Sequence, residues 1–345
     1  MKTVNMLLGF MLLGFCGYGQ QKPHYTQYIL NQYVINPALS GIENYIDVNV
    51  SHRHQWAGID GSPVTTYITA QGPINKGDYR ASPTGYDMVD EQNPRGSDYW
   101  NNYEASPAHH GVGLQLFKDN SGALSNTAAY ATYAYHMALA PSINLSAGFG
   151  AGVSRYNINQ SMLDFMNTEV DPSVYNTYAL NKTKFDLNAG VYLYASKYFV
   201  GLSAQQIVPS KLVFSNNKIT TLDGKTVPHI FLAGGYRFLV NEDFNITPSL
   251  MLKYIQPMPI QAEANVKVQY RDALWAGLGY RHKDGVAVMA GFRVLNLVRV
   301  SYSFDYSTTL LKAYNDGTHE LLLGFTIGNR NNHKQIYTCP RERNW

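Results

Sequence analysis

Segments of about ten residues in which apolar and polar side chains alternate are the feature that most constrains this fold. The first of them is "YIDVNVSHRHQW" at residues 45–56. Successive side chains of a strand point to opposite faces, so this pattern predicts a strand with one apolar and one polar face. The apolar face is expected to hold Ile46, Val48, Val50 and Trp56, and the polar face Asp47, Asn49, Ser51, Arg53 and Gln55.

The same alternation recurs at 185–195, 260–270 and 298–306. Two architectures would produce it: a soluble sandwich with one wet face per sheet, or a membrane barrel with lipid outside and a polar lumen. Strand length separates them, because soluble strands typically have about 5–6 residues and membrane strands need about 9–11. Most segments reach the longer value. The sequence therefore predicts an all-β protein, a transmembrane antiparallel β-barrel whose many tyrosines form aromatic girdles.

About 14 strands are predicted, an even number as in bacterial single-chain barrels. Connections from an even strand to the next odd one are short, such as 140–142 and 271–273, whereas several odd-to-even connections are long. Outer-membrane barrels have short periplasmic turns and long extracellular loops, so this asymmetry assigns the two ends. The expected strands are 44–56, 63–72, 109–118, 126–138, 143–155, 184–196, 198–208, 228–239, 243–255, 259–271, 273–282, 286–294, 297–307 and 318–328.

Two features of the first strands need an interpretation. In the first hairpin, Trp56 ends the lipid-facing row and is expected at headgroup level, while Arg53 faces inward. Residues 75–107 then join the second and third strands, where a short periplasmic turn is expected. This inserted segment extends from the periplasmic face or folds into the lumen, unless the strand parity is wrong there.

The N-terminus has the pattern of a secretory signal peptide, residues 1–19. Lys2 precedes an apolar stretch, and Gly17 and Gly19 are small residues before the expected cut. A lipoprotein modification at Cys16 is less favoured, because the bulky Phe15 precedes it. The protein is therefore expected to be exported and to reside in the outer membrane.

The composition argues against several classes of protein and of binding site. Without Lys2, 26 basic residues face 24 acidic ones, which is no nucleic-acid-binding footprint. Cys339 is then the one remaining cysteine, so no intramolecular disulfide and no cysteine-based metal site can form. Charged residues make up 15%, against about 25% in soluble domains. After the N-terminus no apolar run reaches the roughly 18 residues of a membrane helix.

No motif for catalysis or cofactor binding is present, so we expect no enzyme activity and no cofactor. The glycine-rich "GFGAGVS" at 148–154 lies inside an expected strand, where glycines ease barrel curvature. His52 and His54 would share a strand face, and His109 and His110 are adjacent, but no third metal ligand is evident. A hydrolase triad cannot be placed from the sequence.

Charged side chains are expected on the inner face, where they avoid the cost of facing lipid, about 2–4 kcal/mol for Arg or Lys at the membrane centre. Both signs alternate around the wall, which favours a salt-bridged lumen over a polar conduit. These residues are Asp186, Lys253, Glu263, Lys267, Arg281, Arg293, Arg299, Asp305 and Glu320.

Several motifs occur in order along the mature chain. "YILNQYVINPALSG" at 28–41 is followed by "RHQWAGIDGSPVTTYITAQGPI" at 53–74. After them come "GVGLQLFKDNSGALSNT" at 111–127, "YFVGLSAQQIV" at 198–208, "LWAGLGYRHKDG" at 274–285 and "GTHELLLGF" at 317–325. Together they resemble the PorP/SprF family, outer-membrane proteins associated with the type IX secretion system of Bacteroidetes. The segment 75–107 is longer than expected for that family, and the C-terminal extension resembles the SprF branch.

The resemblance implies a non-enzymatic role in secreting, or attaching to the cell surface, a large adhesin such as those used in gliding motility. It implies cargo with a type B C-terminal signal domain, and type IX secretion components and outer-membrane lipid as further partners. The alternative is a diffusion channel or hydrophobic-compound transporter, since fourteen strands can enclose a ligand path. An outer-membrane hydrolase is the third hypothesis.

The barrel is expected to span 43–329, followed by a C-terminal tail at 330–345. Residues 20–42 lack alternation and contain two prolines, so we expect a segment at the periplasmic end or a plug in the lumen. The long loops near 156–183 and 209–227 offer rings that either bind the adhesin or fold over the barrel mouth. These candidate partner-binding residues are Tyr156, Phe165, Met166, Tyr175, Tyr178, Leu212 and Phe214.

Overall fold

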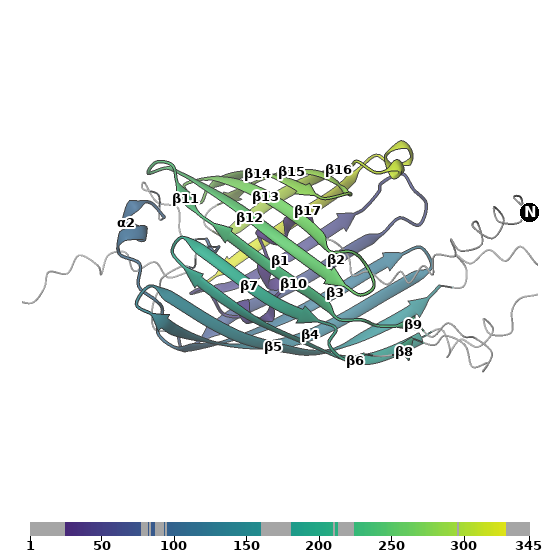
Figure 1. Ribbon diagram of the computed structural model, residues 1–345, viewed down its shortest axis with the longest axis horizontal. Helices are drawn as coiled ribbons and strands as arrows, with labels where there is room; N and C mark the ends of the chain where they lie inside the picture. Colours follow the sequence, from purple (N-terminus) through teal and green to yellow (C-terminus); the bar gives the residue numbers. More distant parts are fainter. Residues whose placement is uncertain are drawn as a thin grey trace, which may run out of the picture.

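The computed structural model describes residues 25–76, 82, 84–86, 93, 95–159, 181–209, 211–212, 224–294 and 297–328. In this part of the chain, fourteen antiparallel strands close into a barrel (Figure 1). They are β1 (Ile46–His54), β2 (Val64–Ile74), β3 (His109–Ser121), β4 (Leu124–Ala140), β5 (Ile143–Ile158), β6 (Asn181–Ala195), β7 (Tyr198–Gln205), β10 (His229–Tyr236), β12 (Phe244–Ile255), β13 (Gln261–Tyr270), β14 (Leu274–Arg281), β15 (Gly285–Val294), β16 (Val298–Ser307) and β17 (Thr318–Ile327).

Smaller elements decorate the barrel. β11 (Phe238–Leu239) pairs with β12, and β8 (Lys211–Leu212) pairs with β9 (Gly224–Lys225) in a separate two-stranded sheet. The helical elements are the 3-10 turns η1 (Thr26–Ile29), η2 (Gln32–Val34), η3 (Pro37–Leu39) and η5 (Leu310–Tyr314) and the short helix α2 (Ser97–Asn101). None of the helices in the described ranges is long and apolar enough to cross a membrane.

The predicted barrel is confirmed, and each expected strand overlaps one of the fourteen barrel strands; the expected strand 228–239 also covers the short β11. β1 closes the barrel against β17, from Ile46 opposite Ile327 to His54 opposite His319. β10 continues the wall by pairing with β12 after the connection that contains β8 and β9. Strands β3 to β6 run to 13–17 residues, which is longer than expected, because strand pairing continues beyond the predicted ends.

The two faces of the wall differ as the alternation predicted. Large apolar side chains such as Leu278, Val288 and Phe149 are exposed on the outside. Of the nine charged residues expected inside, all are buried except Arg293, which is half-buried. Exposed aromatic rings lie near both ends of the strands, at Tyr254, Tyr280 and Tyr306 on one side and at Tyr236, Phe238, Phe244 and Phe292 on the other.

The ends of the barrel are defined by their connections. We call the end where β1 joins β2 the outer end and the opposite end the inner end. The connection between β2 and β3 lies at the inner end, where α2 is drawn at the left of Figure 1. The strands remain antiparallel in sequence order on both sides of it, so a parity error at 75–107 is ruled out.

The prediction that Trp56 ends the lipid-facing row of the first strand is wrong. β1 ends at His54, and Trp56 has a left-handed backbone with φ of 54°. The alternation therefore stops before Trp56 and no longer places it in the lipid-facing row. Instead, Trp56 borders a small cavity beside Arg53 at the outer mouth.

Candidate functional site

Residues 25–42, which we call the strap, lie inside the barrel. The strap forms three short 3-10 turns rather than a strand or a continuous helix. The last turn is capped by Asn36, whose Oδ1 accepts the backbone N–H of Ala38 at 2.9 Å, with Pro37 at the first helical position. Such an irregular buried segment needs partners for its backbone polar groups from elsewhere.

Inward side chains of the wall supply many of those partners. Gln205 of β7 donates to the carbonyl oxygens of Val34 and Ile35, at 3.0 and 2.9 Å. The other wall-to-strap bonds are Gln115 Nε2 to Tyr33 O at 2.7 Å, Ser203 Oγ to Ile35 O at 2.7 Å and Ser146 Oγ to Ala38 O at 2.8 Å. The polar inner face of the barrel is thus matched to the strap.

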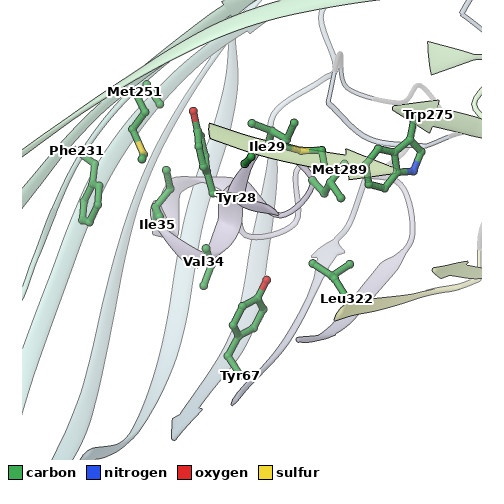
Figure 2. Packing of buried hydrophobic residues seen from close by; sticks show 13 residues of the cluster. Tyr28, Ile29, Val34, Ile35, Tyr67, Phe231, Met251, Trp275, Met289 and Leu322 are labelled. Carbon is green, nitrogen blue, oxygen red and sulfur yellow. The ribbon is translucent and has the colours of Figure 1, made fainter. Parts of the chain in front are cut away.

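Apolar side chains hold the strap as well. Figure 2 shows Tyr28, Ile29, Val34 and Ile35 of the strap among rings and aliphatic chains that project from the wall. Burying one such side chain is worth about 1.5–3 kcal/mol relative to leaving it in water. The wall residues of this cluster are Tyr67, Phe231, Ala233, Met251, Trp275, Ala287, Met289 and Leu322.

Glycines let the strap approach the wall closely. A Cβ atom on Gly111 would lie 1.8 Å from the carbonyl oxygen of Ser40. A Cβ atom on Gly148 would lie 2.7 Å from the Cα atom of Ala38. Gly148 belongs to the "GFGAGVS" stretch, so at least this glycine makes room for the strap in addition to any effect on curvature.

At the outer end, buried ion pairs fix the start of the strap. Arg53 contacts Asp305 Oδ2 at 2.8 Å and Glu320 Oε2 at 3.1 Å. Thr26 lies between them: its N–H donates to Glu320 at 2.9 Å, and its hydroxyl accepts from Arg53 at 2.6 Å and donates to Asp305 at 2.5 Å. Arg281 pairs with Glu263 beside this cluster, at 2.9 Å.

Two stacked histidines fix the other end of the strap. The rings of His109 and His136 are 4.5 Å apart and nearly parallel. Nε2 of His136 lies 2.8 Å from the carbonyl oxygen of Ser40, and Nε2 of His109 lies 3.2 Å from that of Gly41. These residues lie toward the inner end, so the strap runs along the lumen from the outer mouth to the inner one.

The inner mouth is covered by the described part of the 75–108 connection, residues 82, 84–86, 93 and 95–106, which we call the inner cover. Arg95 pairs with Asp272 at 3.0 Å. The ring of Tyr86 lies 4.5 Å from the guanidinium of Arg299, and burial raises the pKa of Tyr86 to about 12, so its phenol is neutral. The sequence left two positions open for residues 75–107, outside the periplasmic face or inside the lumen. The described part combines both, because it extends from the inner end and also reaches into the mouth.

Further contacts fasten the inner cover to the rim. The guanidinium of Arg237 lies over the ring of Tyr99 at 4.9 Å. The backbone N–H of Ser97 donates to Glu242 Oε2 at 3.1 Å, and this hydrogen bond lowers the pKa of the Glu242 carboxyl. The inner cover is therefore held by an ion pair, a hydrogen bond and cation–ring contacts, which come from the inner turns of the wall and from Arg299 of β16.

Little free volume is left between these parts. A cavity beside Arg53 and Arg281 measures about 20 Å³, one beside Asn36 and Tyr192 about 10 Å³, and one beside Glu43 and Tyr86 about 30 Å³. A single water molecule needs at least about 10–15 Å³ on this measure. Each of these three spaces has the size of one to a few water molecules and is too small for a substrate.

A family model described as "Type IX secretion system membrane protein PorP/SprF" matches residues 17–325. The match spans the strap and nearly the whole barrel. The chain belongs to the PorP/SprF family. It is thus a membrane protein of a type IX secretion system, and its barrel places it in the outer membrane.

Solved structures with detectable similarity are remote from this PorP/SprF protein. The toluene transporter TbuX of Ralstonia pickettii is 7% identical, with a TM-score of 0.48, and the match covers 86% of this chain and 93% of that one. The toluene transporter TodX of Pseudomonas putida is 10% identical, with a TM-score of 0.46 and coverage of 88% and 94%. A FadL homologue of Pseudomonas aeruginosa is 9% identical, with a TM-score of 0.45 and coverage of 90% and 96%. No curated protein matches the sequence.

The partner-binding candidates of this PorP/SprF chain are placed only in part. Tyr156 lies in β5 rather than in a loop, and its buried hydroxyl accepts from Gln206 Nε2 at 3.3 Å. The backbone of Leu212 lies in β8. The signal peptide, the C-terminal tail and the candidates Phe165, Met166, Tyr175, Tyr178 and Phe214 lie outside the described residues.

The histidines considered as metal ligands have other neighbours. His52 and His54 lie 2.9 Å from Thr66 Oγ1 and 3.0 Å from Ser62 Oγ. His109 faces the strap, while His110 faces outward and contacts the hydroxyl of Tyr133. Within the described ranges, no three His, Cys, Asp or Glu residues are grouped as a metal site would require.

The strap and its contacts were the functional feature that sequence reasoning left open. The wall residues that hold the strap are ordinary inward polar positions, such as Gln115, Ser146 and Gln205. The signals that pointed to it were the two prolines and the missing alternation in 20–42.

Proposed function

We propose that this barrel is a non-enzymatic partner of a secreted adhesin, needed to export it or to keep it on the cell surface. The adhesin is expected to be of the gliding-motility type and to carry a type B C-terminal signal domain. The observation that carries the proposal is the family match over residues 17–325. The buried strap supports it, because the strap and the described part of the inner cover lie across the route that a diffusing solute would take through the lumen.

The alternative, a channel or transporter for small hydrophobic compounds, requires the strap to leave the lumen. The strap is fixed at both ends, by the ion pairs around Thr26 and by the stacked histidines. Its middle is buried in the apolar cluster of Figure 2. A permanently open channel is therefore disfavoured.

The contacts of the charged groups at the outer mouth also support a binding role over an enzymatic one. In the described residues, the buried ionisable groups at the outer mouth contact one another or the strap. They surround a space the size of a single water. We further propose that residues 1–19 are removed as a signal peptide during export.

The outer loops remain the proposed contact with the adhesin, through Phe165, Tyr175, Tyr178 and Phe214, since large rings are common interface anchors. Tyr156 takes no direct part in this proposal, because it is buried in the wall. At the inner end, the inner cover is proposed to face the secretion components in the periplasm.

The test compares a strain that lacks the barrel with strains that carry the wild type or a loop-shortened variant. One variant shortens residues 160–180, a second shortens 210–223, and the matched control shortens the inner segment 87–92. We expect both outer-loop variants to release adhesin into the medium. Quantitative immunoblots of cells and medium measure this, and heat-dependent electrophoretic migration confirms folding. Adhesin that stays on cells lacking the barrel would overturn the proposed function.

A further inference from the structure

The lipid-facing wall between β12 and β16 contains a groove of about 730 Å³ near the inner end. It lies outside the barrel, on the face opposite to the strap. Its lining is almost wholly apolar, and Phe244, Tyr270, Leu274 and Phe292 stand at the side nearest the inner rim. Nothing in the proposed function uses this surface.

The register of the strands explains the groove. Ala276 of β14 lies directly opposite Ala290 of β15, and both methyl groups face outward. Larger outward residues flank this pair across the strands, with Val268 opposite Ala276 and Tyr302 opposite Ala290. Two adjacent alanines among larger neighbours form a depressed floor.

Large side chains also bound the floor along the strands. Leu274 and Phe292 face each other toward the inner end, and Leu278 and Val288 face each other toward the outer end. All four are well exposed on the outside of the barrel. The depression is thus bounded by larger side chains on every side and opens only toward the membrane.

A cation lies at the inner rim of the groove. Arg271 follows Tyr270 at the end of β13, and its guanidinium lies 5.4 Å from the centre of the Tyr270 ring. Its side chain is one-third exposed, and Nε contacts Asp243 Oδ1 at 2.5 Å. Because the short turns mark the periplasmic end, this position is at the headgroup level of the inner leaflet.

We propose that this groove binds one phospholipid of the inner leaflet, with an acyl chain over Ala276 and Ala290 and the phosphate beside Arg271. The apolar lining fits a hydrocarbon chain, and a guanidinium is a good donor for a phosphate. This site differs from the ordinary lipid-facing wall in two ways. Side chains surround the bound acyl chain, and the phosphate meets a guanidinium that Asp243 holds in place at the rim.

The test uses the full chain in a mild detergent and titrates a phospholipid with brominated acyl chains. The ring of Trp275 is buried on the strap side of the wall, so the reporter is a Tyr302→Trp variant, which places an indole on the rim of the groove where bound bromine is expected to quench it. The chain with Tyr302 gives the background signal of the native tryptophans, which is subtracted. For the reporter chain we expect saturable quenching at one lipid per barrel.

Two variants and a control, each made in the reporter chain, decide the outcome. Ala290→Phe fills the floor and is expected to weaken binding by about tenfold or more. Arg271→Gln is expected to weaken binding of the phospholipid but not of brominated diacylglycerol, which has no phosphate. Ala264→Phe, a lipid-facing change on β13 outside the groove, is the matched control and is expected to bind as the reporter chain does. Heat-dependent migration confirms that each variant is folded.

Three results would overturn the proposal. Quenching that rises without saturation and equally in all variants means ordinary contact with fluid lipid. Equal binding of diacylglycerol and phospholipid to the reporter chain removes the role of Arg271. Tighter binding of a lipid-modified peptide than of phospholipid assigns the groove to the acyl anchor of a lipoprotein.

Discussion

Asn36 joins the strap to the wall with both ends of its amide. Its Oδ1 caps the turn at Ala38, while its Nδ2 donates to the carbonyl oxygen of Val191 at 3.1 Å. Gly190 leaves room for this contact, since a Cβ atom there would lie 2.1 Å from Asn36 Oδ1. One residue of the motif "NPALSG" thus shapes the strap locally and attaches it to β6.

The variant Asn36→Asp tests this double role. The carboxylate keeps the acceptor for Ala38 but loses the donor to Val191, and a buried unsatisfied group costs about 1–3 kcal/mol. We expect faster hydrogen–deuterium exchange in peptides that cover the strap, with no change in the barrel strands. Asn241→Asp is the control, because the amide oxygen of Asn241 serves as an acceptor in an exposed turn. Equal exchange in both variants would show that the Val191 contact is unimportant.

Arg53 joins the two carboxylates of the outer ion cluster, Asp305 and Glu320. In Arg53→Met, Glu320 loses its ion-pair partner and Asp305 keeps only a distant one, Arg281 at 3.9 Å. Breaking a buried ion pair in this way costs about 3–5 kcal/mol. We expect a lower urea midpoint for unfolding in vesicles, followed by heat-dependent migration. The exposed Arg155→Met is the control, and equal midpoints for the two variants would contradict the expectation.

At the scale of elements, the strands could be predicted, whereas for the strap the sequence left two positions open, the periplasmic end and the lumen. A strand such as β13 repeats a period of two over ten residues, and the same signal recurs fourteen times, so errors in one segment do not change the fold. The strap has no period. Its place depends on side chains such as Gln205 and Ser146, which are far away in the sequence and look like any inward polar residue.

Two other features could be predicted only in part, for physical reasons. The left-handed backbone at Trp56 interrupts the alternation, and an alternating pattern cannot reveal where such a residue turns. The inner cover is held by ion pairs and rings, as between Arg95 and Asp272 or Arg299 and Tyr86, which leave no periodic trace in the sequence. For the partner-binding loops, aromatic content alone did not separate a wall residue such as Tyr156 from a loop residue.

The fit between strap and wall predicts the effect of Gly111→Val. The added side chain would occupy the position of the Ser40 carbonyl, so the end of the strap must leave the wall. Ser40 is fully buried, and a Ser40→Cys reporter in a background with Cys339→Ser and Cys16→Ser measures the change. In the parent, we expect the thiol to react slowly with a maleimide. With Gly111→Val we expect the reaction to be at least about tenfold faster, which corresponds to a loss of about 1.4 kcal/mol in the free energy that keeps the strap closed.

A matched glycine provides the control for that experiment. At Gly234 in β10, the nearest atoms to an added Cβ lie at 3.4 Å or more, so Gly234→Val is expected to leave the reporter protected. If both valine variants label alike, the close approach at Gly111 does not hold the strap in place.

For the whole molecule, the strap and the inner cover are two closures in series. The strap fills the lumen from Thr26 to Gly41, and the inner cover closes the mouth beneath it through Tyr86 and Arg95. Removal of one closure leaves the other in the path of a solute. A test of the channel hypothesis must therefore remove both, singly and together.

Four proteins separate the two leading functions in a planar bilayer: the wild type, a deletion of residues 20–42, a replacement of 75–107 by a short turn, and the combination. We expect no steady current from the wild type, since the strap lies in the lumen and the inner cover lies across its inner mouth. Each single change is expected to give brief, small currents, because one closure remains. The double variant is expected to give a steady pore, because a fourteen-stranded barrel without its contents encloses a polar, water-filled lumen.

Heat-dependent migration controls for folding in each case. A steady wild-type current would favour the diffusion channel over the adhesin partner, and a silent double variant would mean that chain outside these two segments also closes the barrel.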